Sequence, residues 1–266
     1  MARPTECMDD LMSERSRVPK LTVDYWVVQV LAVTLGETAA DYLKVNLELG
    51  LVTSIWTVVC LSAVALIVQF KQRRYIPVVY WASAILISIA GTLLADAMID
   101  GCGTDPRSAA AFFAVILTAT LALWFGIECS ISFVAITTAR REIFYWLALV
   151  FTFALGAAAN DVLAETYSLG RLEAALFWVM IVAAVATSSY AFKFSLMKSF
   201  WVASILISPM GSSLGDLLSQ PLNRGGFGFG TVAPSLIFLA IIVAFIPYMT
   251  LTRDDAKIRT IYFNFQ

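Results

Sequence analysis

Apolar residues are gathered along this chain into long runs that short polar segments separate. Eight such runs lie near residues 22–45, 50–70, 76–99, 108–134, 143–165, 171–192, 197–219 and 229–252. A helix of about 20 apolar residues crosses the hydrocarbon core of a bilayer, and in lipid the backbone must form its hydrogen bonds within the segment. Residues 147–155 do not alternate between polar and apolar positions, which argues against a β-barrel. The pattern predicts an all-α polytopic membrane protein with eight transmembrane helices.

The amino-acid composition indicates a chain that is surrounded largely by lipid. Of its 266 residues, 60% are hydrophobic and 14% are charged, whereas a soluble domain has roughly 45–50% apolar and about 25% charged residues. The chain has no histidine, and its four cysteines include no Cys-x-x-Cys pair, so neither a zinc site nor a disulfide framework is indicated. The basic residues form no patch, which argues against nucleic-acid binding.

Basic residues are divided unevenly between the two sides of the predicted spans. Fourteen lysines and arginines lie on the side that carries both chain ends, and four lie on the other side. Because cytoplasmic loops are enriched in basic residues, we expect a bacterial inner-membrane protein with both termini in the cytoplasm. Residues 1–21 and 253–266 are then tails, and residues 22–134 and 143–252 form two halves. The first 20 residues carry charges before any apolar run, so we expect no cleaved signal peptide.

One residue pattern recurs in the first, third, fifth and seventh predicted helices. An aromatic residue precedes a tryptophan, a glycine follows the tryptophan by ten residues, and an aspartate follows the glycine by five. Two helices form each repeat, so all four hairpins enter the membrane in the same direction and can surround one axis with pseudo-fourfold symmetry, a twofold relation joining the two halves. The four sets are Tyr25, Trp26, Gly36 and Asp41; Tyr80, Trp81, Gly91 and Asp96; Tyr145, Trp146, Gly156 and Asp161; and Phe200, Trp201, Gly211 and Asp216.

Three further stretches of sequence carry a resemblance to a known family. They are the Trp…Gly-Glu-Thr…Asp pattern of the first helix, the Leu-Gly-Asp-Leu-Leu-Ser-Gln-Pro run at 214–221, and the Thr-Thr-Ala-Arg-Arg-Glu-Ile-Phe-Tyr-Trp run at 137–146. The chain resembles a bacterial family of uncharacterised repeat-containing membrane-anchored proteins over nearly its whole length. The resemblance implies the topology and implies no activity.

The repeated tryptophans and glycines suggest structural roles. Tryptophans near the starts of helices are typical of an aromatic belt at the headgroup level, and we expect Trp26, Trp81, Trp146 and Trp201 to be such anchors. The glycines have two interpretations, close helix packing or a hinge at which backbone carbonyls open toward a substrate. Pro209 adds a kink to the seventh helix because proline removes a helical donor. The hinge candidates are Gly36, Gly91, Gly156, Gly211 and Pro209.

The four repeated aspartates are the main candidates for function. Each lies 15 residues after its tryptophan, roughly 22 Å along a helix, which is in the outer half of the membrane. An intramembrane acid costs about 2.5–3.5 kcal/mol on insertion scales, so the aspartates require a cavity, a proton or a cation. Alternatively, each aspartate caps a helix or accepts hydrogen bonds from a loop. Glu37 lies one turn before Asp41, and two adjacent carboxylates would hold a proton, bind a metal or alternate between the two.

Other polar residues lie one turn away from the aspartates or elsewhere in the membrane. Thr92 and Ser212 lie one turn inward, and Asp100 and Glu165 lie one turn outward. Glu128 either belongs to a gate or reaches the cytoplasmic edge. The predicted metal ligands are Asp41, Asp96, Asp161, Asp216 and Glu37, and the predicted pathway residues are Thr92, Ser212, Asp100, Glu165 and Glu128.

The residue types favour a hard cation, because carboxylate, hydroxyl and carbonyl oxygens suit Mg²⁺, Mn²⁺ or Ca²⁺. The leading hypothesis is a transporter or channel for a divalent cation of the manganese or magnesium class, with the lipid bilayer and the ion as its partners and no covalent cofactor. The alternatives are a path for protons or small organic cations, and a structural or signalling membrane protein without transport. We expect no enzyme, because the motifs of intramembrane aspartyl proteases and any histidine are missing. A homo-oligomer is compatible with this plan.

Overall fold

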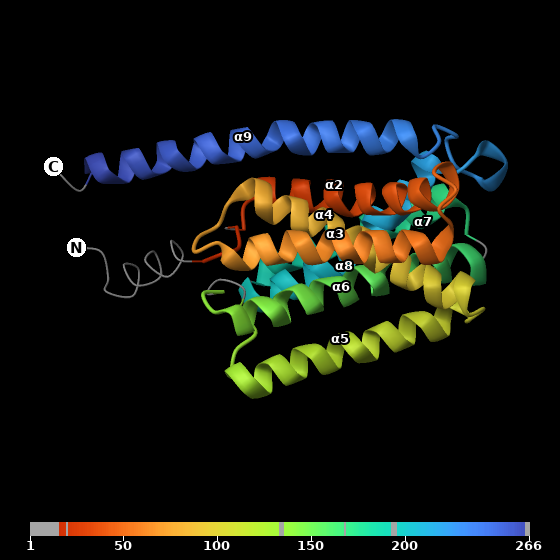
Figure 1. Cartoon of the computed structure of the whole chain (residues 1–266), viewed down its shortest axis with the longest axis horizontal. Coiled ribbons are helices and arrows are strands. Elements are labelled where there is room, and N and C mark those ends of the chain that lie inside the picture. The colour runs from red at the N-terminus through yellow and green to blue at the C-terminus, as the bar shows by residue number, and fades with distance from the viewer. Residues whose placement is uncertain (1–15, 20, 133–135, 168, 193–195, 264–266) are drawn as a thin grey trace.

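The computed structural model describes residues 16–19, 21–132, 136–167, 169–192 and 196–263. Eight long α-helices and no strand are found in this described part of the chain. They follow one another as α2 (Val23–Asp41), α3 (Gly50–Lys71), α4 (Pro77–Asp96), α5 (Pro106–Glu128), α6 (Ala139–Asp161), α7 (Arg171–Phe192), α8 (Leu196–Ser219) and α9 (Val232–Phe263). The prediction of an all-α chain with eight helices is confirmed (Figure 1).

Seven of the described helices are long and apolar enough to cross a membrane, and the protein is therefore a multi-pass membrane protein. Helix α2 does not qualify, because Asp24, Gln29 and Glu37 interrupt its apolar sequence. The helix is instead enclosed by protein, since it contacts α4, α8 and α9. Helix α9 continues to Phe263, within the segment predicted as a tail.

Local sequence signals explain where several helices begin. The hydroxyl of Thr22 accepts a hydrogen bond from the backbone N–H of Tyr25 at the start of α2, and Thr138 does the same for Arg141 at the start of α6. Such caps satisfy backbone donors that a helix start leaves open. Helices α4 and α5 begin with Pro77 and Pro106. Proline has no backbone N–H, but at the first position of a helix that group would have no partner within the helix.

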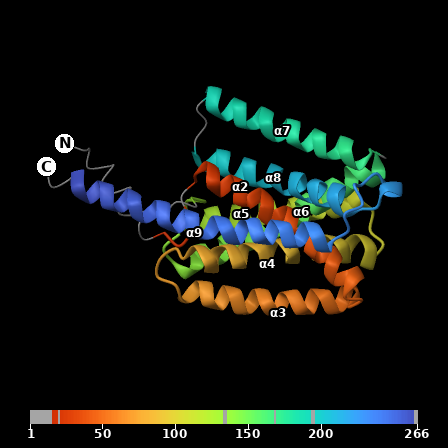
Figure 2. The same cartoon turned by 90° about the horizontal axis from the view of Figure 1, so that it is seen from above.

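Four helices form a closed ring, and four others lie outside it. Helix α2 contacts α4, α4 contacts α6, α6 contacts α8, and α8 contacts α2. We call these the ring helices. In α4, α6 and α8, 50–67% of the span residues are buried, compared with 11–17% in α3, α5, α7 and α9. Figures 1 and 2 show α9 and α5 on opposite sides of the ring and α7 and α3 on the other two sides. The latter four helices are called the outer helices.

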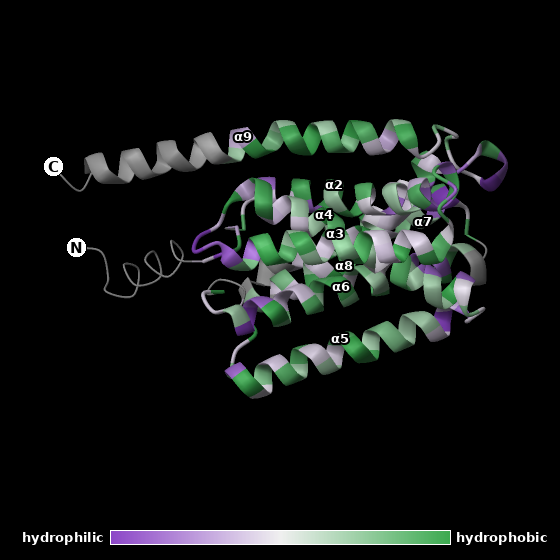
Figure 3. Ribbon diagram, viewed as in Figure 1, coloured by the Kyte–Doolittle hydropathy of each residue, from purple (hydrophilic) through white to green (hydrophobic). Residues whose placement is uncertain are grey.

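Three of the outer helices pack against the ring helix that follows them in the chain, and the last packs against the first ring helix. Helix α3 packs on α4, α5 on α6, α7 on α8, and α9 on α2. The last of these contacts joins the two ends of the chain and completes the arrangement. The outer helices carry long apolar stretches along the sides of the molecule, and hydrophilic residues gather at its two ends (Figure 3). This distribution is expected for a helix bundle with lipid at its sides and water at its ends.

The repeated glycines allow the ring helices to pack closely. A Cβ added at Gly91 would lie 2.5 Å from Cβ of Phe153 on α6, and one added at Gly211 would lie 2.7 Å from Cβ of Val33 on α2. In the same way, Gly36 abuts Ser88 on α4, and Gly156 abuts the Ser208–Pro209 segment of α8. In every case the contact lies three residues before the glycine of the next ring helix. The ring helices remain α-helical through all four glycines and Pro209, so the structure favours close packing over a hinge.

The aromatic residues at the starts of the ring helices form an interlocked layer, which we call the aromatic layer. The ring of Tyr25 lies 5.6 Å from that of Trp81, Tyr80 lies 5.5 Å from Trp146, Tyr145 lies 6.4 Å from Trp201, and Phe200 lies 5.9 Å from Trp26. Trp81, Trp146 and Trp201 are at most 4% exposed. The prediction that these three tryptophans anchor the protein at the lipid headgroups is wrong, because a neighbouring ring helix covers each of them.

A π-helical turn follows the aspartate in three of the four ring helices. These turns are η1 (Tyr42–Asn46), η2 (Ala97–Gly101) and η3 (Val162–Thr166). After Asp216, α8 instead ends at Ser219, and Pro221 precedes the short helix η4 (Leu222–Arg224). Proline cannot donate the backbone hydrogen bond that a π turn would need. Because π turns occur often at functional sites, they draw attention to the aspartate end of the ring.

Candidate functional site

The predicted carboxylates gather at the end of the ring opposite the aromatic layer. Asp41, Asp96 and Asp161 are the last α-helical residues of α2, α4 and α6, and Asp216 lies three residues before the end of α8. Glu37 is close enough to all four aspartates to interact with them electrostatically. We call these five residues the carboxylate cluster. The ring thus brings together five acids that are far apart in the sequence.

Lys44 joins two members of the carboxylate cluster. Its Nζ lies 2.9 Å from Oδ1 of Asp41 and 2.7 Å from Oδ2 of Asp96, and the three side chains are 13–18% exposed. The lysine reaches both carboxylates because it lies in the π turn η1, one turn after Asp41. The ammonium group of Lys44 therefore lies between two ring helices, at the place where a metal cation would bind the same two aspartates.

Asp216 has a different set of partners. Its Oδ2 accepts hydrogen bonds from Nη1 of Arg171 on the outer helix α7 and from Nδ2 of Asn160 on α6, the latter at 2.9 Å. Asp216 is 5% exposed. A buried carboxylate is stable only when it is paired and hydrogen-bonded, and these two donors meet much of that need.

Glu37 lies one helical turn before Asp41 on α2 and has no basic partner in the described part of the chain. It is 8% exposed, and its Oε2 accepts a hydrogen bond of 3.3 Å from Thr92 on α4. On its other side, a Cβ added at Gly215 of α8 would lie 2.8 Å from Cβ of Glu37. The glycine therefore leaves the space that the glutamate side chain occupies.

The remaining predicted residues are placed as follows. Asp161 is partly buried, Ser212 is 1% exposed, and Asp100 is exposed in η2. The side chain of Glu165 lies outside the described residues. Glu128 lies at the opposite end of the molecule, where its Oε2 is 2.8 Å from Nε of Arg141. Of the two interpretations of Glu128, the structure favours the membrane edge.

Sequence reasoning missed three residues of this site, Arg171, Asn160 and Gly215. A comparison of the position four residues after the repeated glycine would have found two of them. That position holds Ala40 and Ala95 in the first two repeats but Asn160 and Gly215 in the others. Arg171 had a weaker signal, because it is one of only four basic residues on its side of the predicted spans.

The site offers carboxylate oxygens as ligands, but the ammonium group of Lys44 already pairs with two of these carboxylates, Asp41 and Asp96. In the described residues, no group of three or more acidic or cysteine side chains has a geometry that could hold a metal ion. Asp41, Asp96 and Glu37 could supply ligands to a cation only if the ammonium group of Lys44 moved away.

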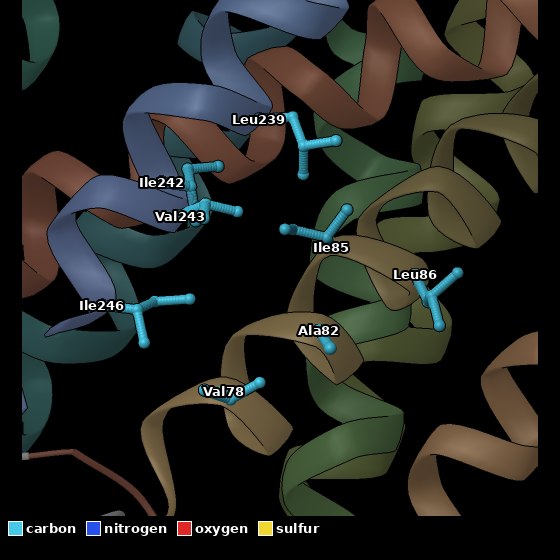
Figure 4. Close-up of a pocket in the computed structure, with 8 residues that line it drawn as sticks. All are labelled: Val78, Ala82, Ile85, Leu86, Leu239, Ile242, Val243 and Ile246. Carbon is cyan, nitrogen blue, oxygen red and sulfur yellow. The ribbon is translucent and has the colours of Figure 1, made fainter.

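One lateral groove contains no polar group suited to a cation. It has a volume of about 290 Å³, lies between α4 and α9, and is lined by aliphatic residues such as Ile85, Leu86 and Ile242 (Figure 4). Both helices are apolar enough to span a membrane. The carboxylate cluster, not this groove, is therefore the candidate site for an ion.

Comparison with known proteins identifies the repeat. One family model, described as a Repeat of Unknown Function (DUF347), matches residues 25–75, 79–129 and 199–255. These segments hold α2 with α3, α4 with α5, and α8 with most of α9. The internal repeat is confirmed by these three matches. No curated protein and no solved structure matches the chain. Because the three matched segments cover more than half of its residues, the chain belongs to the family defined by this repeat.

Proposed function

We propose that this protein is a transporter or channel that moves a hard divalent cation of the manganese or magnesium class across a membrane. The ion binds to carboxylates of Asp41, Asp96, Asp161, Asp216 and Glu37 as it passes along the ring. Carboxylate and hydroxyl oxygens are the ligands that Mg²⁺ and Mn²⁺ prefer. The protein is not an enzyme in this proposal.

Glu37 is the single observation that carries the proposal. It is 8% exposed, has a hydroxyl as its hydrogen-bond donor, and interacts with four other carboxylates. An isolated buried carboxylate is strongly unfavourable. A packing role would be filled better by an alanine, such as Ala157 at the equivalent position of α6. Glu37 therefore needs a proton or a cation, and either one is what a transport site provides.

The proposal includes the arrangement of the repeat in the membrane. Four parallel hairpins surround one axis, and α6 with α7, which the family model does not match, is one of them, since it carries the same aromatic, glycine and aspartate residues. The excess of basic residues beside the aromatic layer puts that end, and both termini, in the cytoplasm of a bacterial cell. The carboxylate cluster then lies in the outer half of the inner membrane.

A proton path is the second candidate, and Lys44 and Arg171 are the observation that favours it. These two residues already pair with Asp41, Asp96 and Asp216. Glu37 could then take up and release a proton without any metal ion. The same chemistry would suit a small organic cation, whose ammonium group resembles that of Lys44.

Thermal unfolding of the purified full-length protein in Mg²⁺, Mn²⁺, Ca²⁺, Zn²⁺ and Na⁺ tests the proposal. A ligand that binds only the folded state raises the free energy of unfolding, by about 2.7 kcal/mol when its concentration is 100 times Kd, and so raises the unfolding midpoint. We expect Mn²⁺ or Mg²⁺ to give the largest rise, and Glu37→Gln and Asp41→Asn to abolish it. Glu48→Gln, an exposed acid at the same end, is the matched control.

Flux measurements in proteoliposomes then distinguish the candidates. Uptake of Mn²⁺ that Glu37→Gln abolishes supports the divalent cation. Proton flux without any metal effect supports the second candidate instead. If the folded wild-type protein carried no flux of any ion, transport would be refuted and a structural role would remain.

Lys44→Met should make the protein more responsive to a divalent cation. The substitution removes the ammonium group that bridges Asp41 and Asp96, so we expect lower stability without metal and a larger Mn²⁺-induced rise in the unfolding midpoint. Lys71→Met, at an exposed lysine at the end of α3, should change neither quantity. An equal response in Lys44→Met and the wild type would show that the cation does not enter between these two aspartates.

A further inference from the structure

At each turn between the aromatic layer and Glu37, two of the three ring helices α2, α4 and α8 carry a polar side chain. One turn beyond the aromatic residue lie Gln29 on α2 and Ser204 on α8; one turn further lie Ser88 on α4 and Ser208 on α8. Each of them is at most 1% exposed. The next turn holds Glu37 itself, with Thr92 and Ser212. We call the four residues Gln29, Ser88, Ser204 and Ser208 the polar track.

The remaining ring helix, α6, shows that the fold does not require polar side chains at these positions. At the equivalent positions, α6 carries Leu149, Phe153 and Ala157, which are at most 4% exposed. Apolar side chains therefore fill the same level of the ring where only packing is needed. The polar residues of the other three helices call for a different explanation.

Several polar atoms of this region have no hydrogen-bond partner in the described part of the chain. They are Oε1 of Gln29 and the hydroxyls of Ser88 and Ser204. Leaving one buried polar group unsatisfied costs about 1–3 kcal/mol. Helical Ser83 and Thr152 avoid this cost by donating to a backbone carbonyl one turn earlier, but Ser88 and Ser204 do not. Buried water is the usual partner of such groups.

The spacing of the polar track fits single bridging waters. The rings of Tyr25 and Phe200 are 6.3 Å apart, so α2 and α8 lie side by side at this level, and Gln29 and Ser204 each lie one turn further along their helices. Each turn of four residues rises about 6 Å, and one water between two oxygen atoms spans about 5.5 Å. Ser88 extends the series to the carboxylate cluster, because its hydroxyl abuts Gly36, next to Glu37.

We propose that the polar track binds a chain of ordered water molecules that connects Tyr25 to Glu37 and forms a proton path through the ring. This inference deepens the proposed function, because it gives the carboxylate cluster a route for protons to the opposite end. Along the chain, each water accepts a proton from one neighbour and releases one of its own to the next, so that no other reactant is required. At the far end, the hydroxyls of Tyr80 and Tyr145 lie 2.6 Å apart in a hydrogen bond.

Hydroxyl-radical labelling by a short X-ray pulse, followed by mass spectrometry, tests the water chain in the full-length protein. Radicals form from water, so a buried side chain is labelled only where water lies beside it. We expect Tyr25, although only 1% exposed, to be labelled at least fivefold faster than Phe113, which is buried at 4% exposure between α5 and α6. Labelling of Tyr25 no faster than that of Phe113 would refute the proposal.

Serine variants provide the matched comparison. Ser204→Ala should slow Tyr25 labelling several-fold, whereas Ser62→Ala should leave it unchanged, because Ser62 is a buried serine with an unpartnered hydroxyl on the outer helix α3. If the track is dry, removing the unsatisfied hydroxyl of Ser204 should raise the unfolding midpoint and leave labelling as it was. The labelling requires no transport, so it gives the same answer whether or not a cation crosses the ring. Slower proton flux in Gln29→Leu proteoliposomes, with the Mn²⁺ response retained, would connect the water chain to proton movement.

Discussion

Gly156→Ala is expected to destabilise the protein by about 3 kcal/mol, near the upper end of the usual cost of overpacking a core. A Cβ at this position would overlap the side chain of Ser208 and would lie 2.8 Å from the backbone nitrogen of Pro209. A flexible side chain could move aside, but the backbone of α8 cannot shift without disturbing its contacts with α2 and α7. Thermal or denaturant unfolding of the purified variant measures the effect.

Gly126→Ala is the control for this prediction. Gly126 lies in the outer helix α5, and an added Cβ would meet nothing within 4 Å. Alanine is favoured over glycine inside a helix by up to about 1 kcal/mol, so this variant should be unchanged or slightly more stable. If Gly156→Ala were equally stable but slow in transport, the repeated glycine would be a hinge and the close-packing interpretation would be wrong.

The sequence predicts the helices well because the signal for a membrane span is long. The run predicted at 143–165 corresponds to α6 and η3, which together cover 139–166, and the run at 171–192 has the bounds of α7. A window of about 20 apolar residues averages out local ambiguity. The parallel direction of the ring helices is likewise a prediction from the sequence, because two predicted crossings separate each repeated pattern from the next.

The sequence does not distinguish a protein-facing side from a lipid-facing side, and this is why the tryptophans were misplaced. In water, an apolar face indicates burial, but in lipid both faces of a helix are apolar. Trp81 was predicted to contact headgroups, yet it is fully buried against Tyr25 of the neighbouring ring helix. The pairing of Arg171 with Asp216 was missed for a related reason. It depends on α7 packing on α8, which no local pattern in either helix indicates.

The gathering of the carboxylates at one end of the ring could be predicted, but their partners could not. Fifteen residues of helix separate each tryptophan from its aspartate, and this spacing places all four acids at one end of the ring. Asn160 donates to Asp216 across a separation of 56 residues. Such a contact arises only from the order of the helices around the ring, so single-residue patterns do not reveal it.

The end of the ring beside the aromatic layer contains a second group of buried charges that no pattern in the sequence indicates. Glu142, at the start of α6, is 1% exposed. Its Oε2 lies 2.6 Å from Nη1 of Arg17, and its Oε1 accepts a hydrogen bond of 2.9 Å from Gln69 at the end of α3. Arg17 is also held by a backbone hydrogen bond to the carbonyl of Ile136. These contacts tie the segment before α2 to two other helices.

Glu142→Ala is therefore expected to destabilise the protein by about 3–5 kcal/mol, the usual cost of breaking a buried ion pair by removing one partner. The variant leaves the guanidinium group of Arg17, whose side chain is only 16% exposed, without its carboxylate. Gln69 loses its acceptor at the same time. Glu173→Ala, at an exposed acid in the first turn of α7, should change stability by less than about 0.5 kcal/mol.

A double-mutant cycle separates the ion pair from the general effect of truncating Glu142. Arg17→Met combined with Glu142→Ala removes both charges, so the double variant should be more stable than the sum of the single effects predicts, by at least about 1.5 kcal/mol. Additive effects would mean that Arg17 and Glu142 do not interact in the folded protein, and the segment before α2 would then have to be held by Val18 packing in the core. A large coupling energy would instead show that charge fixes this segment across the end of the ring, next to the layer where the proposed proton path ends.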